Sequence, residues 1–409
     1  MKRRVIKKRL FFLLILLILP LFFLLPSKKE EEMKDLSTYT KKEVEAYAKE
    51  EELELQIEEE YSESVPKDQM ISQSIPKGKR FHHKDHLKVK FSLGKIDNNV
   101  YQDSHVDELG FVPIMMYHGI YNKKDSETEY TGGNVDYDGY QRTSESFKRD
   151  LETFYQEGYY IIPLKDYIKG EINVPLGKSP MILTFDDGFA NNMQVIGKEN
   201  GKIQIDPNSA VGIMEEFKKK HPDYPVTATF FLNAPLFRQS DYEEEIFDYM
   251  IEHGYDIGNH TYSHPDFTEL TYEEAVEEVG SMYQILEEKL KDHYVHIIAL
   301  PYGSPYDKDH ENFPAILSGN YNGFEYHTDA TLQVGWESNF SPYSKNFDPQ
   351  FMKRVRAYDN NGEGYDIEMN LERLKNTRFI SDGDSNQITI KKEDMEYLKE
   401  NTSRKIVTY

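Results

Sequence analysis

The chain of 409 residues contains no cysteine. This absence excludes disulfide bonds, thiol catalysis, thiolate-ligated zinc and a lipidated N-terminal cysteine. Tryptophan is almost absent as well, because Trp336 is the only one. Positive charge is also scarce: 49 Lys and Arg residues stand against 72 Asp and Glu residues, which gives a formal net charge of −23. The sequence therefore predicts no nucleic-acid partner, since a phosphate backbone needs a basic surface.

Other aromatic residues are plentiful. The chain has 30 Tyr and 23 Phe residues, and hydrophobic residues make up 38% of it. A content of this kind excludes disorder throughout and allows a sizeable core. The length fits one large domain with extra segments, or two modest domains.

The N-terminus carries one long apolar run. Residues 10–26 are apolar except for the interruption at Pro20, and six basic residues lie within the first nine. Seventeen residues are at the short end of what spans a bilayer as a helix. The basic flank should stay in the cytoplasm, so we expect a single-pass signal anchor over residues 1–26, with the rest outside the cell membrane. A cleaved signal peptide is the alternative, although no small-x-small cleavage site follows the run.

Composition changes twice after this run. Residues 27–87 are dense in Glu and Lys, and we interpret them as a solvated, partly helical stalk or linker. Residues 88–409 have a globular composition and are expected to form one domain. The sequence contains no indication of oligomeric state.

The globular part alternates between strand-like and helix-like patterns. Strands are predicted over 111–118, 159–163, 181–185, 226–232 and 296–300, and helices over 144–157, 210–220, 242–253 and 271–291. Such alternation predicts an α/β fold with a mainly parallel sheet, open or closed into a barrel. The polar residues of chemical interest follow these strands, at the end where α/β barrels have their sites.

Two adjacent carboxylates follow the strand predicted over 181–185. Asp186 and Asp187 stand in the stretch Thr-Phe-Asp-Asp-Gly, and Gly188 makes a turn easy, so both carboxylates could reach one pocket. One could then hold a metal ion while the other takes a proton from water. By itself the triplet is more typical of a turn with solvated acids.

Two imidazoles follow another short strand. His260 and His264 come directly after residues 254–259, and their i, i+4 spacing would place them on one side of a helical turn. One Asp and two His residues suit a divalent cation with open coordination positions. Alone such a pair is often accidental, but together with Asp186 and Asp187 it indicates metal-assisted hydrolysis.

In combination with Pro301-Tyr302-Gly303, these motifs resemble the polysaccharide deacetylase family, which is also called the NodB homology domain or carbohydrate esterase family 4. The resemblance covers about residues 110–360. It implies a distorted (β/α) barrel and hydrolysis of acetyl groups on N-acetylated glycans, or less often of O-acetyl groups on xylan.

The resemblance also implies roles for single residues. Asp187, His260 and His264 would hold the metal, most often Zn²⁺, and Asp186 would be the general base. The backbone N–H of Tyr302 would stabilise the oxyanion. Two further residues, Asn259 and Thr261, would orient the ligand loop.

Two departures from the family pattern concern proton transfer. Ala299 stands where the family usually has an Arg that pairs with the base, and no His follows His327 to supply the usual late acid. We therefore consider His118, at the end of the first strand, either as the acid or as a hydrogen-bonding residue of the core. Trp336 is interpreted either as a core residue or as a stacking surface in the groove.

These observations predict a membrane-anchored, outward-facing, metal-dependent deacetylase of an N-acetylated cell-surface glycan. Peptidoglycan and poly-N-acetylglucosamine are the leading substrates. One alternative is an O-acetyl esterase of xylan or a cell-wall polymer. The other is a glycan-binding module without turnover, which Ala299 and the missing late His favour.

Overall fold

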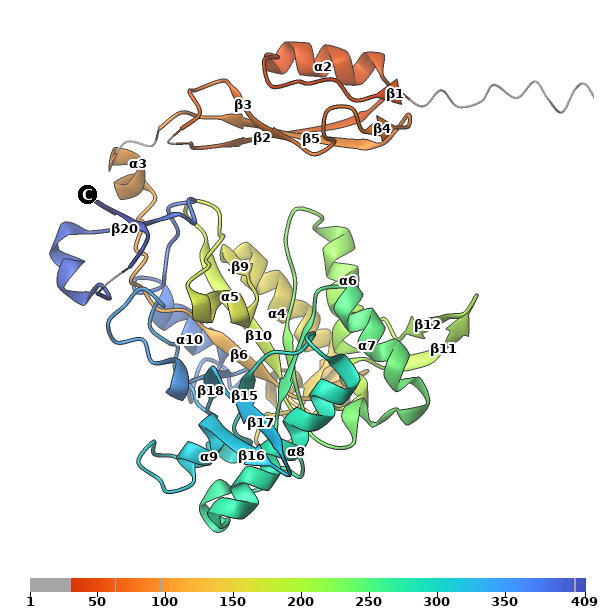
Figure 1. The fold of residues 1–409 in the computed structure, drawn as a ribbon, viewed down its shortest axis with the longest axis vertical. Coiled ribbons are helices and arrows are strands. Elements are labelled where there is room, and N and C mark those ends of the chain that lie inside the picture. The colour runs from red at the N-terminus through yellow and green to blue at the C-terminus, as the bar shows by residue number, and fades with distance from the viewer. Residues whose placement is uncertain (1–30, 63, 96–97, 401) are drawn as a thin grey trace, which may run out of the picture. The chain divides into compact units, whose positions relative to one another are not determined.

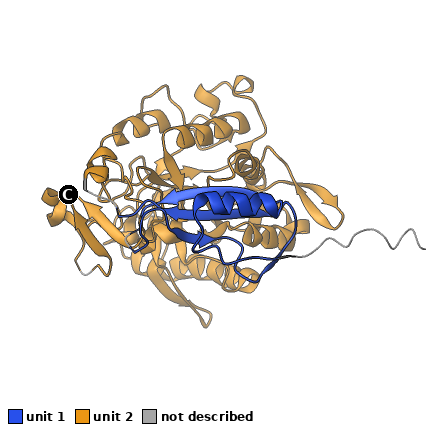
Figure 2. Cartoon of the chain, turned by 90° about the horizontal axis from the view of Figure 1, so that it is seen from above, with its two compact units in different colours: residues 1–97 blue, residues 98–409 orange. Residues whose placement is uncertain are grey.

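The computed structural model describes residues 31–62, 64–95, 98–400 and 402–409 (Figure 1). The chain divides after residue 97 into an N-terminal and a C-terminal unit, which Figure 2 shows in blue and orange. The anchor predicted over residues 1–26 lies outside the described residues. None of the described helices has the length and hydropathy needed to cross a membrane.

The N-terminal unit is a small α/β structure. Its strands are β1 (Glu31–Glu32), β2 (Glu54–Glu60), β3 (Met70–Gln73), β4 (Arg80–Phe81) and β5 (His86–Ser92), and its helix is α2 (Lys41–Glu50). β5 lies between β2, to which it is parallel, and β3, to which it is antiparallel. Thr40 caps α2 in a capping box with Glu43.

The expectation of a solvated stalk over residues 27–87 is therefore wrong for the described part of that segment. Leu87, Val89 and Phe91 alternate along β5 and are fully buried in a core with residues of α2. The residues between them face outward, where Lys88 pairs with Glu58 of the neighbouring strand. Buried apolar and exposed charged residues alternate along β5, as is typical of a strand, but the many charged residues made this pattern hard to recognise in the sequence.

The C-terminal unit contains the remaining elements. Its helices are α3 (Asn98–Asp103), α4 (Ser144–Gln156), α5 (Leu164–Lys169), α6 (Ala210–Lys220), α7 (Glu243–Glu252), α8 (Tyr272–Leu290), α9 (Phe313–Leu317) and α10 (Ile367–Leu374). Its main-sheet strands are β6 (Ile114–Tyr117), β9 (Tyr159–Ile161), β10 (Ser179–Phe185), β13 (Thr229–Leu232), β14 (Asp256–Asn259), β15 (Ile297–Ala299), β18 (Ala330–Leu332) and β19 (Val355–Arg356).

Shorter strands form pairs outside the main sheet. They are β7 (Ile120–Tyr121) with β8 (Arg142–Thr143), β11 (Val195–Glu199) with β12 (Lys202–Ile205), β16 (Ser318–Tyr321) with β17 (Phe324–His327), and β20 (Gln387–Ile390) with β21 (Lys405–Thr408). Figure 1 shows the β11–β12 hairpin projecting away from the sheet.

The main sheet has the order β18-β15-β14-β13-β10-β6-β19, with β9 beside the start of β10. Every pairing in it is parallel. A parallel bridge between Leu332 and Met352 brings its two edges together, so the sheet curls. One core fills the space between the sheet and α4, α6, α7 and α8, and a second lies on the other face. The predicted α/β class is confirmed, with a curled parallel sheet.

The curl sets where polar side chains can meet. Residues that follow β6, β10, β13, β14 and β15 all emerge at the carboxyl edge of neighbouring parallel strands. That edge carries the residues singled out from the sequence.

Candidate metal centre

Asp186 and Asp187 leave the carboxyl end of β10, a strand that is buried along its whole length. Asp187 and Gly188 have φ values of 70° and 54°, so the chain turns sharply after the strand. A side chain at Gly188 would also lie 2.8 Å from Leu232 Cδ2. This turn points the two neighbouring carboxylates in different directions.

His260 and His264 lie in an irregular loop after β14, not on a helix. The expectation of a helical turn is wrong because Thr261 and His264 both have a φ of 64°. Asn259 Oδ1 accepts a hydrogen bond from the Thr261 N–H at 2.7 Å, and Thr261 Oγ1 accepts one from the His264 N–H at 3.1 Å. Asn259 and Thr261 thus hold the loop that carries both imidazoles.

The loop brings the two imidazoles to Asp187. Its Oδ1 lies 3.3 Å from His260 Nε2 and 3.4 Å from His264 Nε2. One ligand atom from each of the three residues lies within 4.8 Å of the others. His260 Nδ1 lies 2.7 Å from the Ala299 carbonyl oxygen, to which it can donate, leaving Nε2 as the ligand atom.

The three residues fit a divalent cation. His260 Nε2 is buried and has no hydrogen-bond partner among the described residues. A buried polar atom without a partner is costly, and a metal ion would satisfy it. Burial raises the pKa of Asp187, but the nearby imidazole of His260 outweighs that effect and lowers this pKa below its ordinary range. A carboxylate that stays ionised and two imidazoles are suitable ligands for zinc and similar metals.

Arg354 is a functional residue that the sequence analysis missed. Its Nη1 and Nη2 donate to Asp186 Oδ1 and Oδ2 at 2.7 and 2.6 Å, and both side chains are buried. Burial raises the pKa of Asp186, but the Arg354 guanidinium outweighs this and lowers it. Arg354 thus pairs with Asp186, which the family usually pairs with an Arg at the position of Ala299. The signal for it was weak: one Arg beside a two-residue strand, 168 positions from its partner.

Asn233 is a second residue that was missed. It follows β13, is buried, and its Nδ2 donates to Asp187 Oδ1 at 3.2 Å. The same oxygen faces both imidazoles, so Asn233 fixes the orientation of the carboxylate toward them.

His118 and Tyr302 flank the cluster in different ways. His118 follows β6, and its Nδ1 is buried without a hydrogen-bond partner among the described residues. Burial lowers its pKa, against the opposing charges of Asp186 and Asp187. Tyr302 lies in the turn Pro301–Gly303, is 57% exposed, and its ring centroid is 4.7 Å from that of His264. The role of its N–H stays a prediction.

Trp336 is 56% exposed, so its interpretation as a core residue is wrong. Its ring centroid lies 6.4 Å from that of Tyr365.

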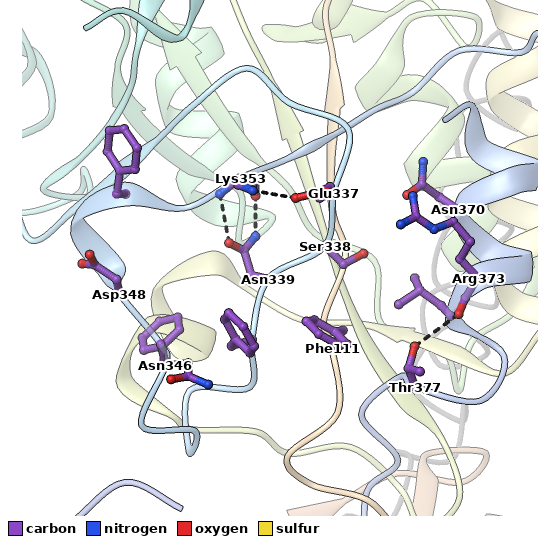
Figure 3. A pocket seen from close by; sticks show the side chains of 14 residues that line it. Phe111, Glu337, Ser338, Asn339, Asn346, Asp348, Lys353, Asn370, Arg373 and Thr377 are labelled. Atoms are coloured by element: carbon purple, nitrogen blue, oxygen red, sulfur yellow. Dashed lines mark hydrogen bonds and ion pairs between the residues drawn. The ribbon is translucent and has the colours of Figure 1, made fainter. Parts of the chain in front are cut away.

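A cavity of about 660 Å³ lies elsewhere in the C-terminal unit (Figure 3). Phe111 and Asn339 line it, and Asn339 pairs with Val112 at the amino end of β6. None of the cluster residues lines this cavity. It is therefore not the site at the carboxyl edge.

Comparisons with known proteins identify two segments. Residues 173–314 match the family "Polysaccharide deacetylase", and residues 31–93 match "PASTA domain". The first match is narrower than the span of 110–360 expected from the sequence. It confirms the resemblance for the segment that contains Asp186, Asp187, His260, His264 and Tyr302.

The chain is also similar to individual relatives. It is 29% identical over 140 residues to the peptidoglycan-N-acetylmuramic acid deacetylase PdaC of Bacillus subtilis (strain 168), a match of 34% of this chain and 24% of that protein. The chain thus spans about a quarter of this curated relative. The solved structure of PdaC aligns at 25% identity over 34% of this chain and 54% of that one, with a TM-score of 0.23.

A further solved structure is that of the Streptococcus pyogenes deacetylase PplD in complex with acetate. It aligns at 19% identity over 66% of this chain and 99% of that one, with a TM-score of 0.45.

Proposed function

Because residues 173–314 form a polysaccharide deacetylase domain, we propose that this protein is a metal-dependent hydrolase that removes N-acetyl groups from a cell-surface glycan. One observation carries the proposal: the cluster of Asp187, His260 and His264 lies beside Asp186. Asp186 is a second carboxylate, and Arg354 keeps it ionised through an ion pair. Metal-assisted hydrolysis needs both parts.

Asp187, His260 and His264 would hold the metal, and Zn²⁺ is the ion that we propose. When bound, the cation supplies Lewis-acid polarisation of the acetyl carbonyl and makes the attacking water more acidic. Asn233 keeps the Asp187 oxygen directed at the imidazoles, and the Ala299 carbonyl keeps His260 in the required tautomer.

Asp186 is the proposed general base. Arg354 keeps it ionised, so it can take a proton from water as the water oxygen attacks the acetyl carbon. The carbon–nitrogen bond then breaks, acetate leaves, and the sugar amine takes up a proton. The backbone N–H of Tyr302 is proposed to stabilise the oxyanion formed on the acetyl oxygen.

His118 is the proposed donor of the proton to the amine. Its unpartnered Nδ1 and its position after β6, next to β10, support this role. Because burial lowers its pKa, His118 must first take up a proton to act as the donor, and the charges of Asp186 and Asp187 favour that uptake. Asp186, once protonated, is the alternative donor, and a His118→Gln variant distinguishes the two. Loss of kcat would assign the proton to His118, and retention of kcat would assign it to Asp186.

The substrate is proposed to lie outside the cell. The apolar run of residues 10–26 with its basic flank supports a single-pass membrane anchor. The PASTA match of residues 31–93 and the peptidoglycan substrate in the name of PdaC support a cell-wall glycan. Peptidoglycan is thus favoured over poly-N-acetylglucosamine.

Two observations favoured the glycan-binding alternative, Ala299 and the missing late His, and the first no longer does so. Ala299 suggested a base without its partner, but Arg354 holds Asp186 with two hydrogen bonds. No observation among the described residues favours the O-acetyl esterase.

Acetate release tests the proposal. Wild-type protein with added Zn²⁺ should release acetate from N-acetylated chito-oligosaccharides or peptidoglycan fragments, and an Asp186→Asn variant should lose about 100-fold or more of that rate. O-acetylated xylan is the parallel substrate. Faster acetate release from xylan than from the N-acetylated substrates would show that the protein is an esterase and not an amidase. If wild type released acetate no faster than the Asp186→Asn variant on every substrate, the proposed enzymatic activity would be refuted.

A further inference from the structure

Arg356 lies on the same face of the sheet as Arg354, the residue that pairs with Asp186. Val355 and Arg356 of β19 pair with Met115 and Met116 of β6. Side chains alternate along a strand, so Arg354 and Arg356 point to the same side, while Val355 points into the core between sheet and helices. Arg354 binds Asp186 on that side.

Arg356 is also closer to the carboxyl edge than Arg354. Two residues along a strand advance about 6.6 Å, so Arg356 lies one such step beyond the residue that holds the base. It is partly exposed, whereas Arg354 is fully buried. The step leads from the base toward the open side of the site.

Two tyrosines hold the Arg356 side chain in place. Its guanidinium carbon lies 4.1 Å from the Tyr358 ring centroid and 5.2 Å from that of Tyr140. The Tyr140 ring also packs against His118, with 5.0 Å between their centroids. Stacking of this kind fixes the plane of a guanidinium but leaves its N–H groups available for a planar anion.

The charge of Arg356 has no counter-ion in the described part of the chain. No carboxylate there lies within 4.0 Å of its guanidinium, and that group makes no hydrogen bond. The neighbouring Arg354 is fully neutralised by Asp186, and Arg142 by Asp150. Among the described residues, Arg238 and Arg373 also stack on aromatic rings without a carboxylate partner, so what distinguishes Arg356 is its place one step from the residue that holds Asp186.

We propose that Arg356 binds a carboxylate of the substrate, so that the glycan is an acidic one. The proposal rests on the deacetylase function. A guanidinium one step from the base suits a sugar with an acidic ether substituent on the carbon next to the one that bears the acetamido group, as in a muramic acid whose lactyl group carries a free carboxylate and no stem peptide. Bidentate pairing with a guanidinium suits a carboxylate. A neutral poly-N-acetylglucosamine has no such group.

The experiment compares an N-acetylmuramic-type oligosaccharide with the same compound as its methyl ester. For wild type, kcat/KM should favour the free acid by about 10- to 100-fold. An Arg356→Gln variant should bring that ratio near one, and Arg356→Lys should restore part of it. Lys353→Gln is the matched control, because it also removes one positive charge. Lys353 pairs with Glu337, and both residues line the cavity of Figure 3. This control should keep the wild-type ratio.

Binding to the chelator-treated whole chain, measured by calorimetry, decides the matter independently of turnover. Free acid should bind more tightly than ester to wild type and to Lys353→Gln, and equally to Arg356→Gln. An equal affinity of wild type for acid and ester, or a preference that survives in Arg356→Gln, would overturn the proposal. Absence of acetate release with the acid preference intact would instead refute the deacetylase function and leave carboxylate recognition standing.

Discussion

Single residues determine how protons are handled at this site. Arg354 and Asp186 form a buried ion pair with two hydrogen bonds, and Arg354 also donates to Thr184 Oγ1 at 3.2 Å. The pair keeps one carboxylate ionised beside the candidate metal ligands. Removing one partner of such a pair leaves the other buried and uncompensated.

We predict that Arg354→Met lowers the free energy of unfolding by about 3–5 kcal/mol, because it leaves Asp186 buried without its counter-ion. The pKa of Asp186, which Arg354 holds down, should rise. In wild type, ionised Asp186 stabilises the fold at pH values above its unfolded pKa of about 3.9. This contribution is lost as pH falls through its lower folded pKa. Urea unfolding at pH 7 and pH 4 checks both statements. An unchanged midpoint at pH 7 would contradict them.

A second buried pair predicts the opposite pH dependence. Glu108 and Asp382 lie together, and Glu108 accepts hydrogen bonds from the N–H groups of Asp382 and Thr389. Burial first, and then the neighbouring Asp382, raise the pKa of Glu108 well above its ordinary value. A group with a raised folded pKa contributes stability that is complete below its unfolded pKa, about 4.3, and is lost as pH rises through its folded pKa.

We therefore expect the contribution of Glu108 to stability to fall as pH rises from about 4.3, and Glu108→Gln to reduce that loss. Thermal melts at increasing pH above that value provide the measurement. Glu363→Gln, an exposed acid, is the control and should follow wild type. Identical slopes for wild type and Glu108→Gln would show that Glu108 does not hold a proton in the folded state.

Turns at the ends of strands place the candidate metal ligands. The left-handed residues Asp187, Thr261 and His264 and the amide of Asn233 set the positions of the three side chains. Long amphipathic helices were predictable to within a residue or two, as α6 (Ala210–Lys220) and α8 (Tyr272–Leu290) show. The loop of His260 was not, because its backbone depends on hydrogen bonds rather than on hydrophobic periodicity.

At this scale we predict that Asn233→Ala weakens metal binding by about 10- to 100-fold, the usual effect of removing a residue that orients a ligand. Competition with a chromogenic chelator measures the affinity. Asn346→Ala, whose residue lines the cavity of Figure 3, should keep the wild-type affinity. Equal losses in both variants would indicate a general effect on folding.

At the scale of the whole molecule, the chain consists of two units with separate cores. The alternation of strand-like and helix-like patterns was sufficient to predict the α/β class, and the motifs of residues 184–303 were sufficient to predict the family matched by residues 173–314. Arg354 was missed, since only the curled sheet brings it to Asp186 across 168 positions. The fold of residues 31–92 was missed because charged residues on one face of its strands obscured the buried ones.

All ligands of the candidate metal centre belong to the C-terminal unit. A chain shortened to residues 98–409 should therefore bind metal with an affinity within about twofold of the longer chain, while losing the part that matches PASTA domains. Titration of both proteins with Zn²⁺ provides the comparison. A tenfold loss on shortening would show that the N-terminal unit supports the site.

We infer that the cluster of Asp187, His260 and His264 makes this protein a metal-dependent deacetylase. Acetate release from an N-acetylated peptidoglycan fragment, measured while Zn²⁺ is added to chelator-treated protein, tests it most directly. We predict that the rate rises in proportion to bound metal, levels off at one ion per chain, and stays near zero in His260→Ala. A rate that is the same before and after metal removal would contradict the account.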